Sequence, residues 1–89
     1  MLKESVKIKD VKLQIGQLTK VLRKKNKLSQ EELAQLLDLS RITIQNLESG
    51  KNFTIDILLK IVQHFYLLDA FHQKLNEQLN EHKNLKSFY

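Results

Sequence analysis

The chain contains no cysteine and no proline, and only two of its 89 residues are glycine. The lack of cysteine excludes disulfides, cysteine-ligated zinc and thiol chemistry, so packing must supply the stability. With so few residues that break helices, helices joined by short turns are favoured over a strand-rich fold. No apolar run approaches the roughly 18 residues of a membrane span, and the start lacks the hydrophobic stretch of a secretory signal. We therefore expect an all-α, cytoplasmic protein that makes no use of a membrane.

The positive charge is concentrated at the front of the chain. Residues 1–27 carry nine basic and two acidic groups, whereas residues 28–89 carry six basic and eight acidic groups. A local basic surface attracts polyanions such as nucleic acid or an acidic membrane face, and a solvated lysine-rich tail is the alternative. A chain of this length has room for one domain with one core and none for a separate catalytic unit.

The candidate catalytic and metal-binding residues lack the spacing that is typical of an active site or a metal site. His64 lies in an apolar segment, where a half-buried structural histidine is the simpler interpretation, and the other histidines are scattered with few carboxylates nearby. Gly16 and Gly50 are too far apart to form a phosphate-binding loop. Ser29 and Ser40 are better explained as helix caps than as nucleophiles. We expect no enzymatic activity, no metal and no cofactor.

The first segment can be interpreted in two ways. Val6 and Ile8 alternate with polar residues as in a strand, and the alternation continues to residue 15. A helical stripe with spacings of three and four also fits; its members are Ile8, Val11, Ile15, Leu18 and Leu22. We expect an N-terminal arm or strand over residues 1–11 and a helix over residues 12–25. A strand there would need a partner strand from another subunit, because no second strand pattern occurs.

Two short helices are predicted after this one. The first helix should end near Asn26, since asparagine can adopt the left-handed conformation that ends helices. Ser29 and Glu32 form a capping-box pattern at the start of a second helix of about eight residues. The apolar face of that helix comprises Leu33, Leu36 and Leu37, with Ala34 as a small contact point. Ser40 then caps a third helix over residues 41–48, in which Ile44 and Leu47 should point inward.

The remaining chain predicts two more helices. Ser49 and Gly50 end the third helix, and Thr54 opens a fourth whose broad apolar face should close the core. That face comprises Ile57, Leu58, Ile61, Val62 and Phe65. From Asp69 a narrower stripe continues through Phe71, Leu75, Leu79 and His82. Such a stripe is suited to a second copy, another protein or the chain's own domain. The expected division is therefore an arm (1–11), a helical domain (12–68) and a C-terminal helix with its tail (69–89).

Residues 28–50 therefore describe two short capped helices separated by a three-residue turn. A helix braced in this way can present its first side chains to base edges in the major groove, which is about 12 Å wide. Residues 15 to about 68 resemble the Cro and phage-repressor (XRE) helix-turn-helix family. The segments that carry the resemblance are residues 15–16, 22–24, 28–34, 39–41, 43–44 and 47–51. The resemblance implies a compact lambda-repressor-like bundle of four or five helices. One departure is Lys27, where the family often has glycine.

The resemblance implies that the helix after Ser40 is the recognition helix, with Arg41, Ile42, Gln45 and Asn46 facing the bases. Their chemistry agrees with that role. Arginine can donate two hydrogen bonds to guanine, glutamine and asparagine can pair with adenine, and isoleucine can pack on a thymine methyl group.

Other residues are expected to hold the DNA backbone. The resemblance implies that Gln30 binds a phosphate, and that Arg23 and Glu48 form a structural ion pair with the arginine also near a phosphate. The further candidate phosphate contacts are Ser40, Lys24, Lys25, Lys27, Lys51 and Asn52.

The expected function is that of a homodimeric transcriptional regulator, a repressor in the first instance, which binds double-stranded DNA at a two-fold operator. The alternative is an antitoxin that binds a toxin protein and regulates its own operon, because the apolar-rich stretch over residues 54–72 resembles helix-turn-helix antitoxins of the HipB kind. We interpret the surplus apolar residues after residue 65 as a surface for a toxin or a second subunit.

Overall fold

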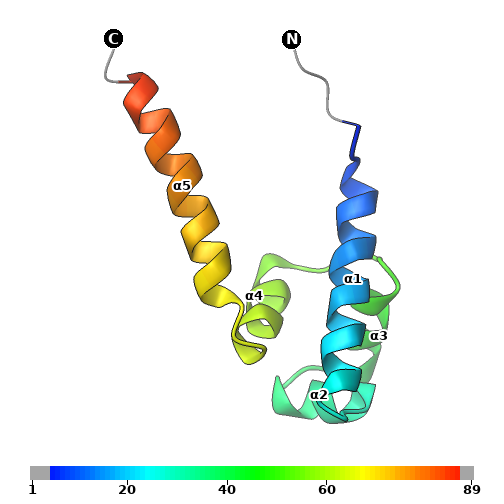
Figure 1. Ribbon diagram of the computed structural model, residues 1–89. Helices are drawn as coiled ribbons and strands as arrows, with labels where there is room; N and C mark the ends of the chain where they lie inside the picture. Colours follow the sequence, from blue (N-terminus) through cyan, green and yellow to red (C-terminus); the bar gives the residue numbers. More distant parts are fainter. Residues whose placement is uncertain (1–4, 87–89) are drawn as a thin grey trace.

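The computed structural model describes residues 5–86 and contains five helices. They are α1 (Ile8–Lys25), α2 (Gln30–Leu36), α3 (Arg41–Glu48), α4 (Ile55–His64) and α5 (Leu68–Lys86). Within residues 5–86 there is no strand, which confirms the all-α prediction. The helices α1 to α4 gather at one end of the molecule, and α5 extends away from them (Figure 1). None of the helices over this range is long and apolar enough to cross a membrane.

The first helix begins earlier than predicted. We expected an arm or strand up to residue 11, but residues 8–11 already form the first turn of α1. The backbone N–H of Lys7 donates to the Asp10 carboxylate over 2.9 Å, which satisfies an amide at the helix start. The strand interpretation is therefore wrong for residues 5–11, because the period of three and four prevailed over the alternation. Residues 1–4 of the expected arm lie outside the described residues.

The core lies where α1, α2, α3 and α4 meet. Its buried centre consists of Leu33, Ala34, Ile44, Leu47 and Ile61. Seven partly buried side chains pack around it: Ile15, Leu28, Leu37, Leu39, Phe53, Ile57 and Phe65. The inward position of Ile44 and Leu47 confirms the prediction for the third helix. Leu36, expected on the apolar face of the second helix, is instead 59% exposed, because this short helix buries only one side.

The N-termini of α2, α3 and α4 begin at the predicted caps. The hydroxyl groups of Ser29, Ser40 and Thr54 accept hydrogen bonds from backbone N–H groups three residues later. At Ser29 the capping box is complete, because the Glu32 carboxylate accepts from the Ser29 backbone N–H over 2.8 Å. Each hydrogen bond satisfies an amide that the helix itself leaves without a partner.

The helices α1 to α4 all end in the same type of turn. In each, the second residue after the helix has a positive φ; these residues are Lys27 (59°), Asp38 (57°), Gly50 (82°) and Tyr66 (62°). The next amide N–H donates to a carbonyl five residues earlier over 2.7 to 3.0 Å, as in a Schellman motif. The expectation that Asn26 takes the left-handed conformation is wrong, since its φ is −92° and Lys27 takes it instead.

Helix α5 makes the molecule elongated, with principal extents of 51 × 26 × 21 Å. It starts at Leu68, one residue before the predicted start. Phe71 is half-buried near its first turn, whereas Leu75, Leu79 and His82 are exposed. Helix α5 therefore presents most of its narrow apolar stripe to solvent, and the expected division of the chain at residues 68–69 stays a prediction.

Candidate nucleic-acid interface

The orientation of α3 is fixed by the side chains that it buries. Ile44 and Leu47 have no exposed surface, so the opposite face of this eight-residue helix points outward. The Ser40 hydroxyl accepts a hydrogen bond from the Thr43 backbone N–H over 3.1 Å and lies 2.8 Å from the Thr43 hydroxyl. Contacts within the protein therefore fix both α3 and its N-terminal cap.

The four predicted base-reading residues lie at or beside the outward face. Arg41 and Gln45 are exposed, Ile42 is 64% exposed, and Asn46 is half-buried. Asn46 lines a shallow depression with Asn52, Phe53 and other residues of the segment between α3 and α4. In Figure 1, α5 lies on the other side of α1 from α3.

A buried ion pair joins α3 to α1. The Arg23 Nε and Nη2 atoms donate to the two carboxylate oxygens of Glu48 over 2.7 and 3.0 Å, and Arg23 Nη1 donates to the Leu28 carbonyl over 2.8 Å. The two side chains are only 9% and 4% exposed. The hydrogen bond to Glu48 raises the pKa of the Arg23 guanidinium above its ordinary value, although burial alone would lower it.

Gln30, a predicted phosphate ligand, also contacts this ion pair. Its amide nitrogen donates to Glu48 Oε1 over 3.1 Å, so the carboxylate accepts from both Arg23 and Gln30. A buried carboxylate needs such donors, because an unsatisfied charge is costly away from water. The same network uses one N–H group on each of the three Arg23 nitrogens. Arg23 and Gln30 therefore both hold the side chain at the end of α3, and their phosphate contacts stay predictions.

Gly16 lets α1 approach α3 at backbone distance. A Cβ atom at this position would lie 2.6 Å from the Leu47 carbonyl oxygen and 2.7 Å from the Glu48 carbonyl oxygen. Such distances do not occur between a methyl group and a backbone oxygen without a shift of one helix. The contact places the end of α3 directly against the middle of α1, which sets the distance between the two helices.

The six further candidate phosphate contacts are all exposed. Lys51 and Asn52 are exposed just after α3, and Asn52 Oδ1 accepts a hydrogen bond from the Lys12 ammonium group. Lys12 was not among the predicted residues, because it lies 40 positions from Asn52 and carries no motif. Lys25 instead lines a depression with Leu22 and the end of α4, away from α3. Ser40, Lys24 and Lys27 are also exposed.

Residues 20–65 match the family model described as helix-turn-helix. The chain belongs to the helix-turn-helix family of the Cro and phage-repressor type. Because the match covers more than half of the chain and includes α2, α3 and the turn between them, this helix-turn-helix protein is a DNA-binding protein of the class that regulates transcription. The family binds DNA and is not typically enzymatic. Nothing among curated proteins matches the chain significantly.

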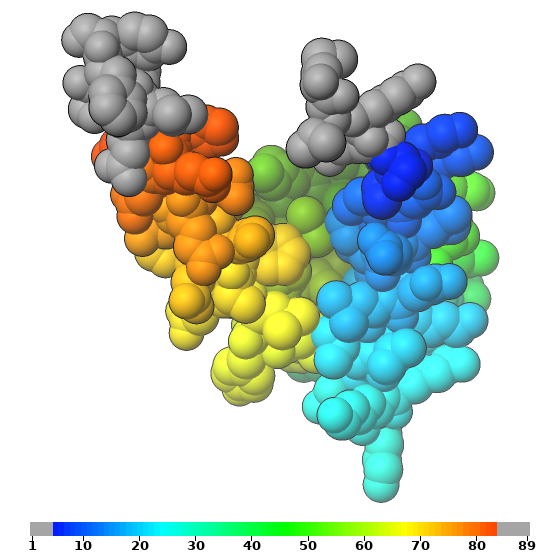
Figure 2. All heavy atoms as spheres, turned by 45° about the horizontal axis from the view of Figure 1, so that its top comes forward, coloured from blue at the N-terminus to red at the C-terminus, as the bar shows by residue number. Residues whose placement is uncertain are grey.

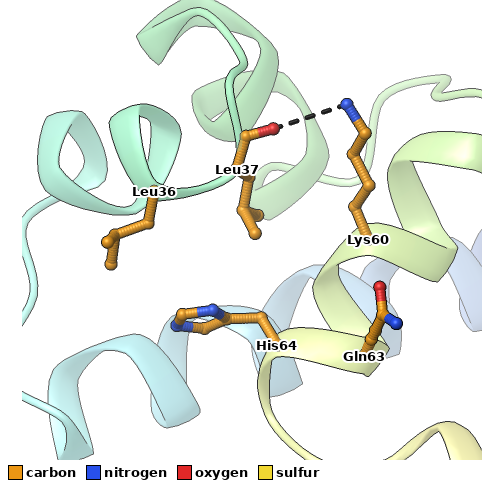
Figure 3. Close-up of a pocket in the computed structure, with 5 residues that line it drawn as sticks. All are labelled: Leu36, Leu37, Lys60, Gln63 and His64. Carbon is orange, nitrogen blue, oxygen red and sulfur yellow. Dashed lines mark hydrogen bonds between the residues drawn. The ribbon is translucent and has the colours of Figure 1, made fainter.

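The helix-turn-helix protein also has a small depression between α2 and α4 (Figure 3). Lys60 reaches the Leu37 carbonyl over 3.4 Å, and the ring of His64 faces Leu36 and Leu37. His64 is half-buried and meets the Phe65 ring edge-on, with 5.0 Å between the ring centroids. His64 thus packs among apolar side chains, and among the described residues no group of three metal-ligating side chains occurs.

Proposed function

We propose that the protein is a transcriptional repressor that binds a two-fold operator as a homodimer and reads the major groove with α3. The supporting observation is that α3 is fixed on its inner side by Ile44 and Leu47 while Arg41, Ile42 and Gln45 stay exposed on the outer side. A helix whose backbone is held in this way loses little further freedom on binding, which favours discrimination between bases. Repression is the simpler regulatory outcome, because an occupied promoter is blocked without any additional contact.

The contacts divide into two classes that experiments can separate. Arg41, Ile42, Gln45 and Asn46 read base edges, whereas lysines such as Lys51 hold the backbone and carry no sequence information. Loss of a base contact changes the preference at one position of the site by about 1–3 kcal/mol. Loss of a phosphate contact weakens binding to all sequences about equally.

Selection of bound sites from a random library of double-stranded DNA tests the proposal. The expected result is a two-fold sequence whose half-sites lie about one helical turn apart. Arg41→Ala should remove the preference at one position of each half-site, while Lys83→Ala on α5 serves as a control that leaves the selected sequence unchanged. Affinity for the best site within a few-fold of that for scrambled DNA would exclude sequence recognition.

A second candidate function is that of an antitoxin. The observation that favours it is the surplus of exposed apolar side chains after α4, including Tyr66, which is 93% exposed, and Leu75 on α5. A toxin protein bound there would cover them, and the same chain would repress its own operon through α3. A larger protein that co-purifies in a fixed ratio, and that is encoded by the adjacent reading frame, is the expected result for this candidate.

A further inference from the structure

Two neighbouring residues of α1 contact the segment that follows α3. The Lys12 ammonium group donates a hydrogen bond to Asn52 Oδ1, and a Cβ atom at Gly50 would lie 2.6 Å from Leu13 Cδ2. In Figure 2 the blue turns of α1 adjoin green atoms, the colour of this part of the chain. The short segment around Lys51 is therefore held against α1 at both of its ends, at Gly50 and at Asn52.

The contact with Lys12 fixes which way the amide group of Asn52 faces. An ammonium group has three donors and no acceptor, so only the oxygen of an amide can face it. With Oδ1 turned to Lys12, the Nδ2 atom of the same planar group points in a different direction. Among residues 5–86, no hydrogen bond is donated by this Nδ2 atom, and the side chain is exposed. Asn52 therefore presents two N–H donors away from Lys12.

The charge of Lys12 has no carboxylate partner in the described part of the chain. Neither of the two ion pairs within residues 5–86 includes it. Lys12 is half-buried, although a lysine on a helix surface normally extends its head group into water. The neutral amide of Asn52 satisfies one donor of the ammonium group and leaves the charge uncancelled. A hydrogen bond from a cation also polarises the amide, which strengthens its N–H groups as donors to an anion.

The Asn52 amide lies beside the recognition helix. Asn52 lines a shallow depression together with Thr43 and Asn46, which belong to α3. Two sugar-phosphate backbones border the major groove, so a duplex whose bases α3 reads brings phosphates to the sides of that helix. Asparagine side chains are among the groups that donate to such phosphates. The N–H groups of Asn52 therefore lie where a DNA backbone is expected to pass.

We propose that Lys12 is a positioning residue for DNA binding, which holds the Asn52 amide with its N–H groups towards a phosphodiester oxygen. Lys12 acts through Asn52, and its charge adds to the attraction of the phosphate. The inference rests on the proposed function, which supplies the duplex, and deepens it by adding a residue of α1 to the backbone contacts. Because a phosphate contact carries no sequence information, the pair affects binding to all sequences alike.

A scan of single phosphates tests whether Lys12 and Asn52 act at the same place. In a series of duplexes that carry the selected site, one phosphate at a time is replaced by a neutral methylphosphonate, and affinity is measured by fluorescence titration. The wild-type chain should lose about 10-fold in affinity at the phosphate that Asn52 binds. Asn52→Ala and Lys12→Met should each weaken binding to the unmodified duplex about 10-fold and should lose the sensitivity to that one phosphate. Lys12→Arg should bind within about 3-fold of the wild type, because arginine also donates without accepting.

Asn52→Asp separates this role from a merely structural one. The new carboxylate keeps the contact with Lys12 and turns it into an ion pair, but it offers the phosphate a negative oxygen in place of two donors. DNA binding should therefore weaken at least about 30-fold while thermal melts show an intact fold. Asn76→Asp, the same change on α5, is the matched control and should weaken binding less than about 3-fold. Lys20→Met, about two turns further along α1, is the control for Lys12→Met and should leave the phosphate scan unchanged.

Three outcomes would overturn the role of Lys12. They are a Lys12→Met chain that binds DNA as tightly as the wild type, a weakened Lys12→Met chain that keeps the sensitivity to the phosphate of Asn52, and equal effects of Asn52→Asp and Asn76→Asp.

Failure of the proposed function is seen separately, with a scrambled duplex. A wild-type chain that binds the selected and the scrambled duplex equally would remove base reading by α3. Lys12→Met should still weaken binding to the scrambled duplex about 10-fold, because the phosphate contact does not depend on sequence. In the Asn52→Ala background the same change should cost less than about 3-fold, since Lys12 acts through Asn52.

Discussion

Gly16 is the residue on which the distance between α1 and α3 depends. We expect Gly16→Ala to destabilise the protein by about 2 kcal/mol, although alanine gains about 1 kcal/mol in helix propensity over glycine. The reason is that the new methyl group would meet two backbone carbonyl oxygens, which cannot rotate away as a side chain can. Urea denaturation checks the stability. Gln17→Ala, an exposed neighbour, should change it by less than about 0.5 kcal/mol.

A second prediction at the scale of single residues concerns the ion pair between Arg23 and Glu48. Glu48→Gln keeps the shape of the side chain but leaves the Arg23 guanidinium buried without a counter-charge. Because both side chains are more than nine-tenths buried, we expect a loss of about 3 kcal/mol in the free energy of unfolding. Arg41→Gln, which removes an exposed charge, is the control and should be nearly neutral. Equal stability of the two variants would show that the pair does not hold α3.

At the scale of whole helices, stability can be raised by a substitution at a residue that ends a helix in the left-handed conformation. Lys27 has a φ of 59°, a conformation that costs a residue with a side chain about 1 kcal/mol and glycine almost nothing. Lys27→Gly should therefore raise Tm by about 4 °C or more. Lys24→Gly, three residues earlier inside α1, removes the same charge but should lower Tm, because glycine weakens a helix interior. Calorimetry of both variants distinguishes the effect of conformation from that of charge.

The capping box of α2 makes stability depend on pH. Hydrogen bonds from the backbone and side chain of Ser29 lower the pKa of Glu32 below its ordinary value of 4.5. A carboxyl group with a lowered pKa in the folded state stabilises that state above its unfolded value, and the contribution is lost as the pH falls through the folded value. Glu32→Gln should therefore flatten the fall in Tm below pH 4.5, whereas Glu31→Gln removes the same charge without touching the capping box and should not.

Local signals explain which helix boundaries were predictable. Ser29, Ser40 and Thr54 act on amides three residues away, so the starts of α2, α3 and α4 follow directly from the sequence. The start of α1 was missed because its apolar residues fit two periods at once, and only packing decides between them. Among the candidate site residues, the positions on α3 were implied by the family resemblance, and Arg41, Ile42 and Gln45 are exposed there. The hydrogen bond between Lys12 and Asn52 did not, since it joins two segments that only the tertiary structure brings together.

At the scale of the whole molecule, α3 and α5 lie on different sides of α1 (Figure 1). Arg41 and Lys51 are exposed on α3 and directly after it, whereas Leu75 and Leu79 are exposed on α5. The direction of α5 causes this separation, and it depends on the turn at Tyr66, where an exposed aromatic residue takes a left-handed conformation. Nothing in the periodicity of α5 itself indicates that direction.

The separation predicts how binding responds to salt. Each phosphate that a lysine neutralises releases counterions, so the slope of log K against log salt falls by about 0.9 for each lost contact. We expect Lys51→Ala to reduce the slope by about that amount and to weaken all sequences equally, because the side chain is exposed just after α3. Lys83→Ala removes the same charge from α5, on the other side of α1, and should leave the slope unchanged if position rather than net charge matters. Fluorescence titrations at several salt concentrations measure both slopes. An equal reduction of the slope in the two variants would mean that DNA binding depends on the total charge of the protein and not on the surface around α3.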